Sequence, residues 1–227
     1  MTLILAIPAT DGIVVASDGQ VTAGEVRWTG EKIRPLGQRT LWSAAGELAL
    51  IQRVEEGIAG IPKETLLSDL RDTLARIVNQ SVRALLDVDF RTPFFAANPD
   101  QLLTLHPGDF LFVEYGPAPR ILHISGNGTP EWFDKPFASG VGAPFAYALL
   151  QRYQGVPMDV SRASLLAVKV LEEAIEVGSY GLGPPLYVWQ VTEKGANKLG
   201  EAEIAALQDA SRTLRSAEVE LLIKGGE

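Results

Sequence analysis

The first 45 residues alternate between short apolar runs and turn residues, which is the pattern of a strand-rich fold. Apolar runs cover residues 2–8 and 13–17. Asp11-Gly12 separates these runs and predicts a tight hairpin turn, because this pair tolerates positive φ. Shorter runs at 26–28, 32–35 and 40–45 predict further strands.

Helical periodicity replaces this pattern from residue 47 onward. We expect a helix over 47–58 and a longer helix over 64–86, on which apolar residues recur three and four positions apart: Leu66, Leu67, Leu70, Leu74, Ile77, Val78 and Leu85. Strands follow at 110–115 and 120–125, and Asn127-Gly128 predicts a second hairpin turn.

The last third of the chain repeats the change from helix to strand. We expect two helices over 145–153 and 160–177, a strand over 186–192, a helix over 201–215 and a closing strand over 219–223. Because strands and helices come in groups, a doubly wound parallel sheet is disfavoured. The order predicts an α+β fold, a four-layer αββα sandwich of two antiparallel sheets, formed by residues 1–227 as one domain. The stretch 91–107 fits no element and is interpreted as an inserted loop.

Composition and charge exclude several classes of function. The net charge of -8 gives no basic face for nucleic acid. No cysteine is present, so thiolate metal sites and cysteine nucleophiles are excluded. The two histidines, His106 and His123, lack the spacing of a zinc site or a triad, so structural roles are expected and neither a metal nor a cofactor is predicted. No signal peptide or apolar run of membrane-spanning length is recognised, which gives the cytoplasm as the expected compartment.

Several motifs follow one another along the chain: Thr2-Leu3-Ile4-Leu5, the run from Asp11 to Thr22, Lys32-Ile33-Arg34, Ala44-Ala45-Gly46 and the run from Ala138 to Tyr147. Together they resemble the proteasome β-subunit family of the Ntn-hydrolase superfamily. Asp18-Gly19-Gln20-Val21-Thr22 is similar to the bacterial HslV-type protease. The resemblance covers roughly residues 2–58 and 108–195 and implies a threonine-type peptidase or amide hydrolase.

A reactive centre at the N-terminus follows from this resemblance. Removal of Met1 would leave Thr2 with a hydroxyl nucleophile and a free α-amino group, whose ordinary pKa of about 7.7–8.0 suits a general base. The resemblance implies that Lys32 lowers the pKa of both groups, that Asp18 pairs with Lys32, and that the backbone N–H of Gly46 stabilises the oxyanion.

The same carry-over gives the substrate pocket and the assembly. The residue preceding the cut bond would be held by Val21, Thr22, Arg34, Ala44, Leu48 and Gln52, with Arg34 favouring an acidic or polar side chain. Members of the family form closed chambers, so self-association into a ring or stacked rings, a protein or peptide substrate and an ATP-driven unfoldase are implied. Contact with a membrane is not.

Three departures from the family pattern leave alternatives open. Val141 stands where the family has a serine, and Gly178 and Gly181 stand where it has an aspartate and a second serine. These residues support the geometry of the active site. A catalytically weak or inactive ring scaffold and an amidase for a small amide are therefore the alternatives.

Overall fold

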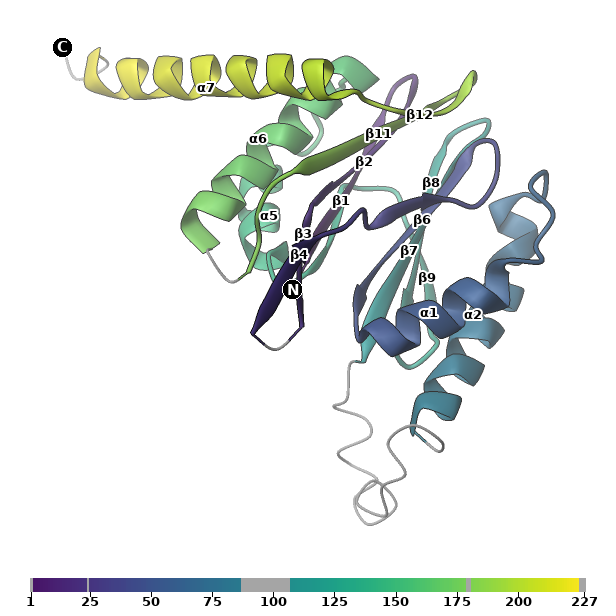
Figure 1. The fold of residues 1–227 in the computed structure, drawn as a ribbon. Helices are drawn as coiled ribbons and strands as arrows, with labels where there is room; N and C mark the ends of the chain where they lie inside the picture. Colours follow the sequence, from purple (N-terminus) through teal and green to yellow (C-terminus); the bar gives the residue numbers. More distant parts are fainter. Residues whose placement is uncertain (1, 24, 87–106, 179–180, 225–227) are drawn as a thin grey trace.

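Two antiparallel sheets lie face to face in the computed structural model, with helices on both outer sides (Figure 1). The structure describes residues 2–23, 25–86, 107–178 and 181–224. The β1 sheet has the strand order β10-β1-β2-β11-β12 and the β7 sheet has the order β5-β6-β7-β8-β9. A separate pair, β3-β4, forms a hairpin beside them.

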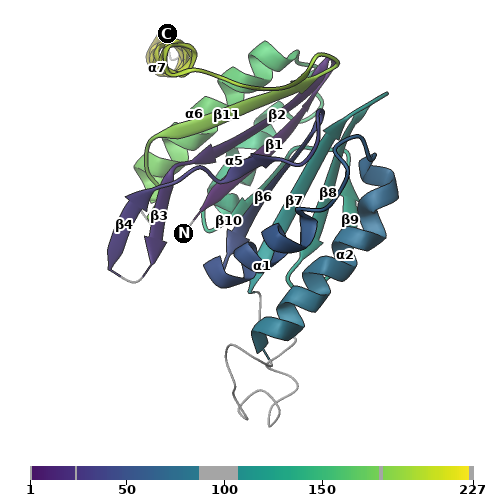
Figure 2. The same cartoon turned by 45° about the vertical axis from the view of Figure 1, so that its right-hand side comes forward.

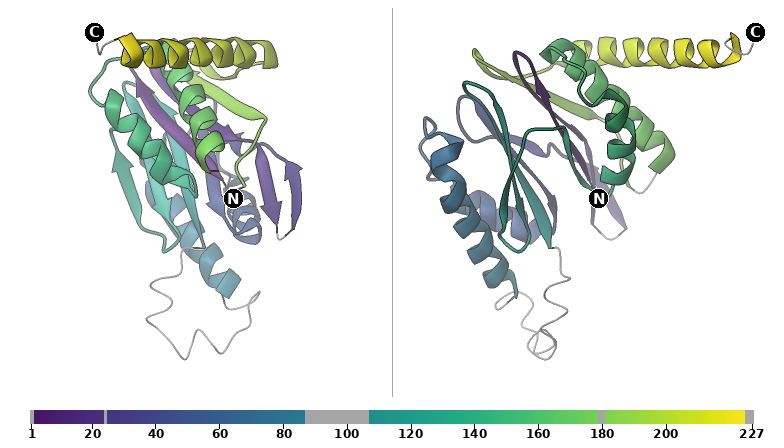
Figure 3. Two further views of the ribbon diagram at one scale, coloured as in Figure 1. Left: turned by 90° about the vertical axis from the view of Figure 1, so that its left-hand side faces the viewer. Right: turned by 180° about the vertical axis from the view of Figure 1, so that it is seen from behind.

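The strands of the β1 sheet come from both ends of the described chain. They are β1 (Leu3–Ala9), β2 (Gly12–Asp18), β10 (Phe137–Gly140), β11 (Leu186–Thr192) and β12 (Gly195–Lys198). Helices α5 (Ala143–Leu150) and α6 (Val160–Gly178) cover the outer face of this sheet, as Figure 3 shows. A short 3-10 helix, η2 (Gln151–Tyr153), follows α5.

The β7 sheet is built from the middle of the chain. Its strands are β5 (Ile33–Pro35), β6 (Thr40–Gly46), β7 (Gly108–Tyr115), β8 (Pro119–Ser125) and β9 (Pro130–Phe133). Helices α1 (Leu48–Ile58) and α2 (Leu67–Ala84) cover its outer face (Figure 1). The hairpin strands are β3 (Gln20–Ala23) and β4 (Val26–Thr29).

Alternation along the strands explains why the sheets can stack. In β1, Leu3 and Leu5 pack toward α6, whereas Ile4 and Ala6 face the other sheet. In β7, Phe110 and Phe112 pack toward α1 and α2, and the residues between them face the β1 sheet. Successive side chains of a strand point to opposite faces, so a strand buried on both sides must be apolar throughout. The predicted four-layer sandwich is confirmed.

Two predictions about the C-terminal part and the first turn need correction. Residues 219–223 form no strand, because α7 (Glu201–Lys224) continues through them and is held by ion pairs such as Lys169–Glu218 at 3.1 Å. The first hairpin turn does not depend on positive φ at Gly12. Glycine is required there because a Cβ would lie 2.5 Å from the carbonyl oxygen of Val191.

The second hairpin turn and most predicted helices agree with the structure. Gly128 has φ of 83° between β8 and β9, as a tight turn after Asn127 requires. Short strands β3, β9, β10 and β12 were not predicted from the sequence. Most of the expected inserted loop, including His106, lies outside the described residues. Within the described ranges, no helix combines the length and apolarity needed to cross a membrane.

Candidate active site

Thr2, Asp18 and Lys32 approach one another because three strands begin or end at the same place. Thr2 directly precedes β1, Asp18 is the last residue of β2, and Lys32 directly precedes β5. Ile4 pairs with Ser17, so the first residues of β1 lie across from the end of β2. Figure 2 shows this end of the sandwich beside the β3–β4 hairpin and the start of α1.

The Asp18 carboxylate is completely buried and receives hydrogen bonds on both oxygens. Oδ1 accepts the Lys32 ammonium at 2.6 Å and the backbone N–H of Leu3 at 2.9 Å. Oδ2 accepts the backbone N–H groups of Gln20 at 3.2 Å and Gly183 at 3.3 Å. Buried carboxylates need such donors to offset lost hydration. The donor at Leu3 also ties the carboxylate to the residue after Thr2.

Lys32 is buried beside Asp18, and its pKa is below the ordinary lysine value. Desolvation is the largest cause and lowers the pKa, while the charge of Asp18 and its hydrogen bond act in the opposite direction. A lysine with a lowered pKa gives up or shares its proton more readily than an exposed one. The structure thus brings two of the predicted catalytic residues into one buried ion pair.

Gly46 ends β6 in a conformation that a side chain would prevent. Its φ is 143°, and a Cβ at this position would lie 2.3 Å from the carbonyl oxygen of Pro107. The next residue, Glu47, donates its backbone N–H to that carbonyl at 2.8 Å. The chain therefore turns sharply at Gly46, directly before α1, and leaves backbone rather than side chain facing the site.

A cavity of about 430 Å³ joins these residues. Its lining includes three of the four predicted catalytic residues and most of the predicted substrate-binding residues: Thr2, Lys32, Gly46, Val21, Thr22, Arg34, Ala44 and Leu48. This volume lies in the usual range for a small-ligand site. Asp18 is not part of the lining, since it lies fully buried behind Lys32.

Gln52 is the predicted pocket residue that the structure does not place in this cavity. The lining contains Leu48 and Ile51 of α1 instead, and Gln52 is exposed. Gln52 lies about 100° around the helix axis from Ile51, and it is Ile51 that meets the cavity together with Leu48.

Sequence reasoning missed several residues of the cavity and of its support. Trp28, Glu31 and Glu47 line the cavity. Trp28 is 41% exposed on the β3–β4 hairpin. The backbone N–H of Gly183 supports the buried Asp18 carboxylate, at 3.3 Å from Oδ2. An aspartate that ends an apolar strand was the signal that such donors would be needed.

The Arg34 guanidinium makes two contacts within the chain that the sequence did not indicate. Its Nε lies 3.1 Å from Glu55 Oε1, and its guanidinium carbon lies 5.1 Å from the centre of the Trp42 ring. Both contacts occupy the guanidinium that the resemblance assigned to an acidic or polar substrate side chain.

The departures from the family pattern are placed only in part. Val141 follows β10 and its side chain is 43% exposed. Gly178 is the last residue of α6, and Gly181 has φ of 79°. Ser179 lies outside the described residues. Within those residues, no group of three or more acidic or histidine side chains is placed to hold a metal.

No protein-family model matches the chain. The chain is 29% identical over 202 residues to the protein named proteasome subunit beta of Nanoarchaeum equitans (strain Kin4-M), an alignment that covers 88% of this chain and 97% of that protein.

A solved structure gives an independent comparison of the fold. Anbu (ancestral beta-subunit) from Yersinia bercovieri superimposes with a TM-score of 0.72 at 16% sequence identity, and the match covers 97% of each chain. At this identity the likeness concerns the fold alone. The chain is therefore similar in sequence to a proteasome β subunit and shares the fold of an ancestral β subunit.

Proposed function

We propose that the chain is a threonine-type peptidase whose nucleophile is the hydroxyl of Thr2 after removal of Met1. The observation that carries this proposal is the convergence of Thr2, Lys32 and Gly46 on one cavity, with the carboxylate of Asp18 buried against Lys32. Each of these residues is common, and their meeting at one cavity from separate strands is what favours catalysis.

The proposed reaction proceeds through an ester of Thr2. The α-amine takes the proton of the Thr2 hydroxyl, and the oxygen attacks the carbonyl carbon of the substrate amide. The carbon–nitrogen bond then breaks, and the leaving amine receives the proton. A water molecule attacks the ester by the same proton path and restores the hydroxyl and the acid product.

Lys32 and Gly46 have separate parts in this reaction. The positive charge of Lys32 stabilises the deprotonated hydroxyl, and Asp18 holds that charge in place despite burial. The backbone N–H of Gly46 is the proposed donor to the oxyanion, and losing such a donor typically costs about 10²–10³ in rate.

The assembly, substrate and partner are also part of the proposal. Both relatives are named as subunits, which supports a ring or stacked rings of this chain enclosing a protein or peptide substrate. An ATP-driven unfoldase would deliver folded substrates, and the cytoplasm is the compartment that fits. Residues 94–105 of the expected inserted loop lie outside the described residues. Exposed apolar residues at the end of α7 support self-association: Val219, Leu221, Leu222 and Ile223.

The test is to treat the purified protein with a peptide β-lactone or boronate and measure its intact mass. We expect loss of Met1 and one adduct at Thr2, absent in Thr2→Ala and retained in the control Thr10→Ala, which changes an exposed threonine in the β1–β2 turn.

The outcome also decides between the alternatives. A free Thr2 that never gains the adduct would favour the inactive scaffold. An adduct in a chain that remains monomeric and cleaves only small amides would favour the amidase.

A further inference from the structure

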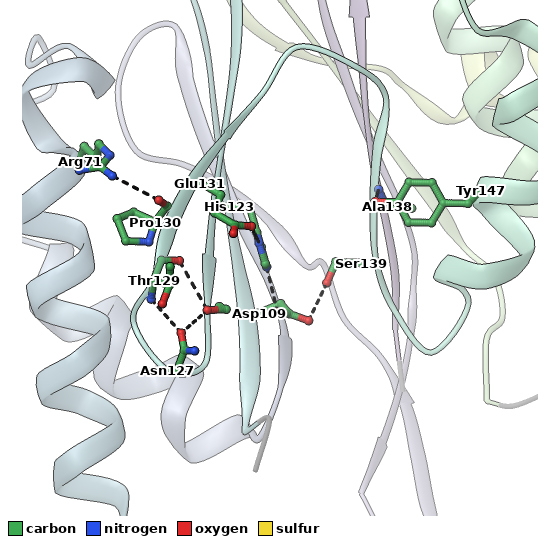
Figure 4. Close-up of polar contacts among 11 residues, drawn as sticks. Arg71, Asp109, His123, Asn127, Thr129, Pro130, Glu131, Ala138, Ser139 and Tyr147 are labelled. Carbon is green, nitrogen blue, oxygen red and sulfur yellow. Dashed lines mark hydrogen bonds and ion pairs between the residues drawn. The ribbon is translucent and has the colours of Figure 1, made fainter. Parts of the chain in front are cut away.

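A polar contact links the two sheets close to the proposed active site. Ser139 of β10 donates its hydroxyl to Asp109 Oδ2 of β7 at 3.2 Å, and His123 Nε2 of β8 lies 2.9 Å from Asp109 Oδ1 (Figure 4). With the Asp109 carboxylate ionised, the His123 tautomer that carries its proton on Nε2 donates to it. We call Ser139, Asp109 and His123 the inter-sheet bridge.

Strand register places Ser139 next to the residue that contacts Thr2, and Asp109 next to the residue that pairs with Gly46. On β10, Ser139 pairs with Ile4, and the next residue, Gly140, pairs with Leu3. A Cβ on Gly140 would lie 2.1 Å from the Thr2 carbonyl oxygen, so β10 directly contacts the nucleophile's backbone. The β1 sheet thus transmits the position of Ser139 to Thr2.

The β7 sheet shows the matching arrangement at Asp109. Asp109 pairs with Ala45, and the preceding residue, Gly108, pairs with Gly46. The nucleophile and the proposed oxyanion donor therefore belong to different sheets, and the bridge joins the strands that adjoin each of them.

The surroundings of the bridge explain why a directional contact matters there. The layer between the sheets is largely apolar, with Ile4, Ala45 and Leu111 among its residues. Dispersion contacts hold such layers together but set no fixed register, whereas a charged hydrogen bond has both length and direction. Ser139 is buried, and the His123 side chain is only 13% exposed.

Aromatic contacts also hold β10, both against the β7 sheet and against α5. The His123 ring lies 4.9 Å from the Phe137 ring, and Phe137 meets Tyr147 of α5 edge-on at 6.5 Å. The Tyr147 hydroxyl accepts the backbone N–H of Ala138 at 3.1 Å, as Figure 4 shows. Both residues before Ser139 in β10 are therefore fixed, and the bridge adds a directional contact to β7 at the position next to Gly140.

We propose that Asp109 and Ser139 are positioning residues that hold Thr2 and Gly46 at the spacing required for acyl transfer, with His123 orienting Asp109. This inference rests on the proposed function. A displacement of about 1 Å between reacting groups can cost about 10²-fold in rate without any change in the groups themselves.

The first test separates positioning from binding and from folding. In Ser139→Ala we expect kcat to fall about 10- to 100-fold and boronate affinity to fall in proportion, while KM changes less than about twofold. Asp109→Ala should behave alike, and the double variant should be no worse than either single variant. Asp109→Asn keeps an oxygen for Ser139 and should recover most of the rate.

A matched control is Ser164→Ala. Ser164 is an equally buried serine in α6 that donates to the Val160 carbonyl at 2.7 Å, far from the site in the β1 sheet's outer layer. We expect a similar loss of thermal stability with unchanged kcat. A Ser139→Ala protein with the kcat and boronate affinity of the parent, or with a change in KM alone, would overturn the proposal.

Amide hydrogen exchange tests the bridge whether or not the chain is an enzyme. In Ser139→Ala, exchange should become faster in peptides covering residues 137–142 and 44–48 together and stay unchanged over 12–17. If the parent protein forms no adduct while exchange responds in this way, the hydrolase proposal fails and the structural link stands. Unchanged exchange in both segments would refute the link, whatever the activity.

Discussion

The Asp18 carboxylate uses both of its oxygens, and Lys32 Nζ contacts only one of them, Oδ1, at 2.6 Å. The second oxygen accepts two backbone N–H groups. Besides the lysine, Asp18 therefore accepts hydrogen bonds from three backbone N–H groups. Removing the lysine leaves a carboxylate that keeps three backbone donors, whereas removing the carboxylate leaves a buried ammonium beside donors that have lost their acceptor.

Asp18→Asn is predicted to destabilise the fold more than Lys32→Met. An amide has one oxygen, so it cannot accept from Leu3 on one side and from Gln20 and Gly183 on the other. We expect a loss of about 3–5 kcal/mol in the free energy of unfolding for Asp18→Asn and a smaller loss for Lys32→Met. Urea denaturation of both variants measures the difference, and equal losses would contradict this account of Asp18.

The loss in Asp18→Asn should shrink at alkaline pH. Burial lowers the pKa of Lys32, and the variant removes the Asp18 contacts that oppose this shift. Between the lowered folded pKa and the unfolded value near 10.5, the unfolded chain binds more protons, so stability rises with pH across that window. Below it both states are protonated and the full penalty remains. Denaturation at about pH 7 and about pH 9.5 checks the sign, with the parent protein as control.

Lys32 is also predicted to be required for hydrolysis, since its proposed role is electrostatic. Lys32→Ala should lower kcat by about 10²–10⁴-fold. Lys32→Arg should fail as well, because the guanidinium keeps its proton and has a different shape. Circular dichroism must show that both variants remain folded. Turnover close to the parent rate in both would remove Lys32 from the mechanism.

Local patterns were enough to predict the layers of this fold but not its inter-sheet contacts. Strands such as β1 and β7 are buried on both faces, so their apolar runs are uninterrupted and easily recognised. Strands β9 and β10 have four residues each, too few to establish a period. They are strands because β8 and β1 offer them free edges.

The candidate site likewise contains residues that the sequence identified and contacts that it did not. Thr2, Asp18, Lys32 and Gly46 were identified by resemblance, and their meeting at one end of the sandwich follows from the strand pairings. The contact of Asp109 with Ser139 joins residues 30 positions apart, and no short sequence motif marks it. The pairing of Arg34 with Glu55 likewise depends on how α1 packs on β5 and β6.

That pairing leads to a prediction about specificity. Because Glu55 and Trp42 hold the Arg34 guanidinium, the parent protein should favour acidic residues before the cut bond less than a free arginine would. Glu55→Gln should raise cleavage after acidic residues, relative to leucine, by up to about fivefold, the range of an exposed ion pair.

Two controls make the peptide-library experiment decisive. Glu56→Gln removes the neighbouring exposed carboxylate and should leave the preference unchanged. Arg34→Met should cancel the effect of Glu55→Gln when the two are combined. A strong preference for basic residues in the parent protein would contradict the placement of Arg34 in the pocket.

Assembly is the last prediction, and α7 gives it a specific test. It packs on α6 as far as Glu218, which lies 3.1 Å from Lys169, and its C-terminal end projects past the body of the chain (Figures 1 and 3). Leu221 and Leu222 are 72% and 82% exposed there. Isolated chains seldom leave such residues in water, so we expect another copy of the chain to cover them in the ring.

Light scattering coupled to size-exclusion chromatography should therefore give a mass several times the 24.5 kDa of one chain. Leu221→Ser combined with Leu222→Ser should shift the protein toward smaller species, because removing apolar area from a contact weakens it by about 25 cal/mol for each Å². Glu220→Ser alters the same turn of the helix without removing apolar surface and should leave the mass unchanged. A monomer at high concentration would defeat the ring and favour the small-amide hydrolase, since a lone open subunit cannot enclose a protein substrate.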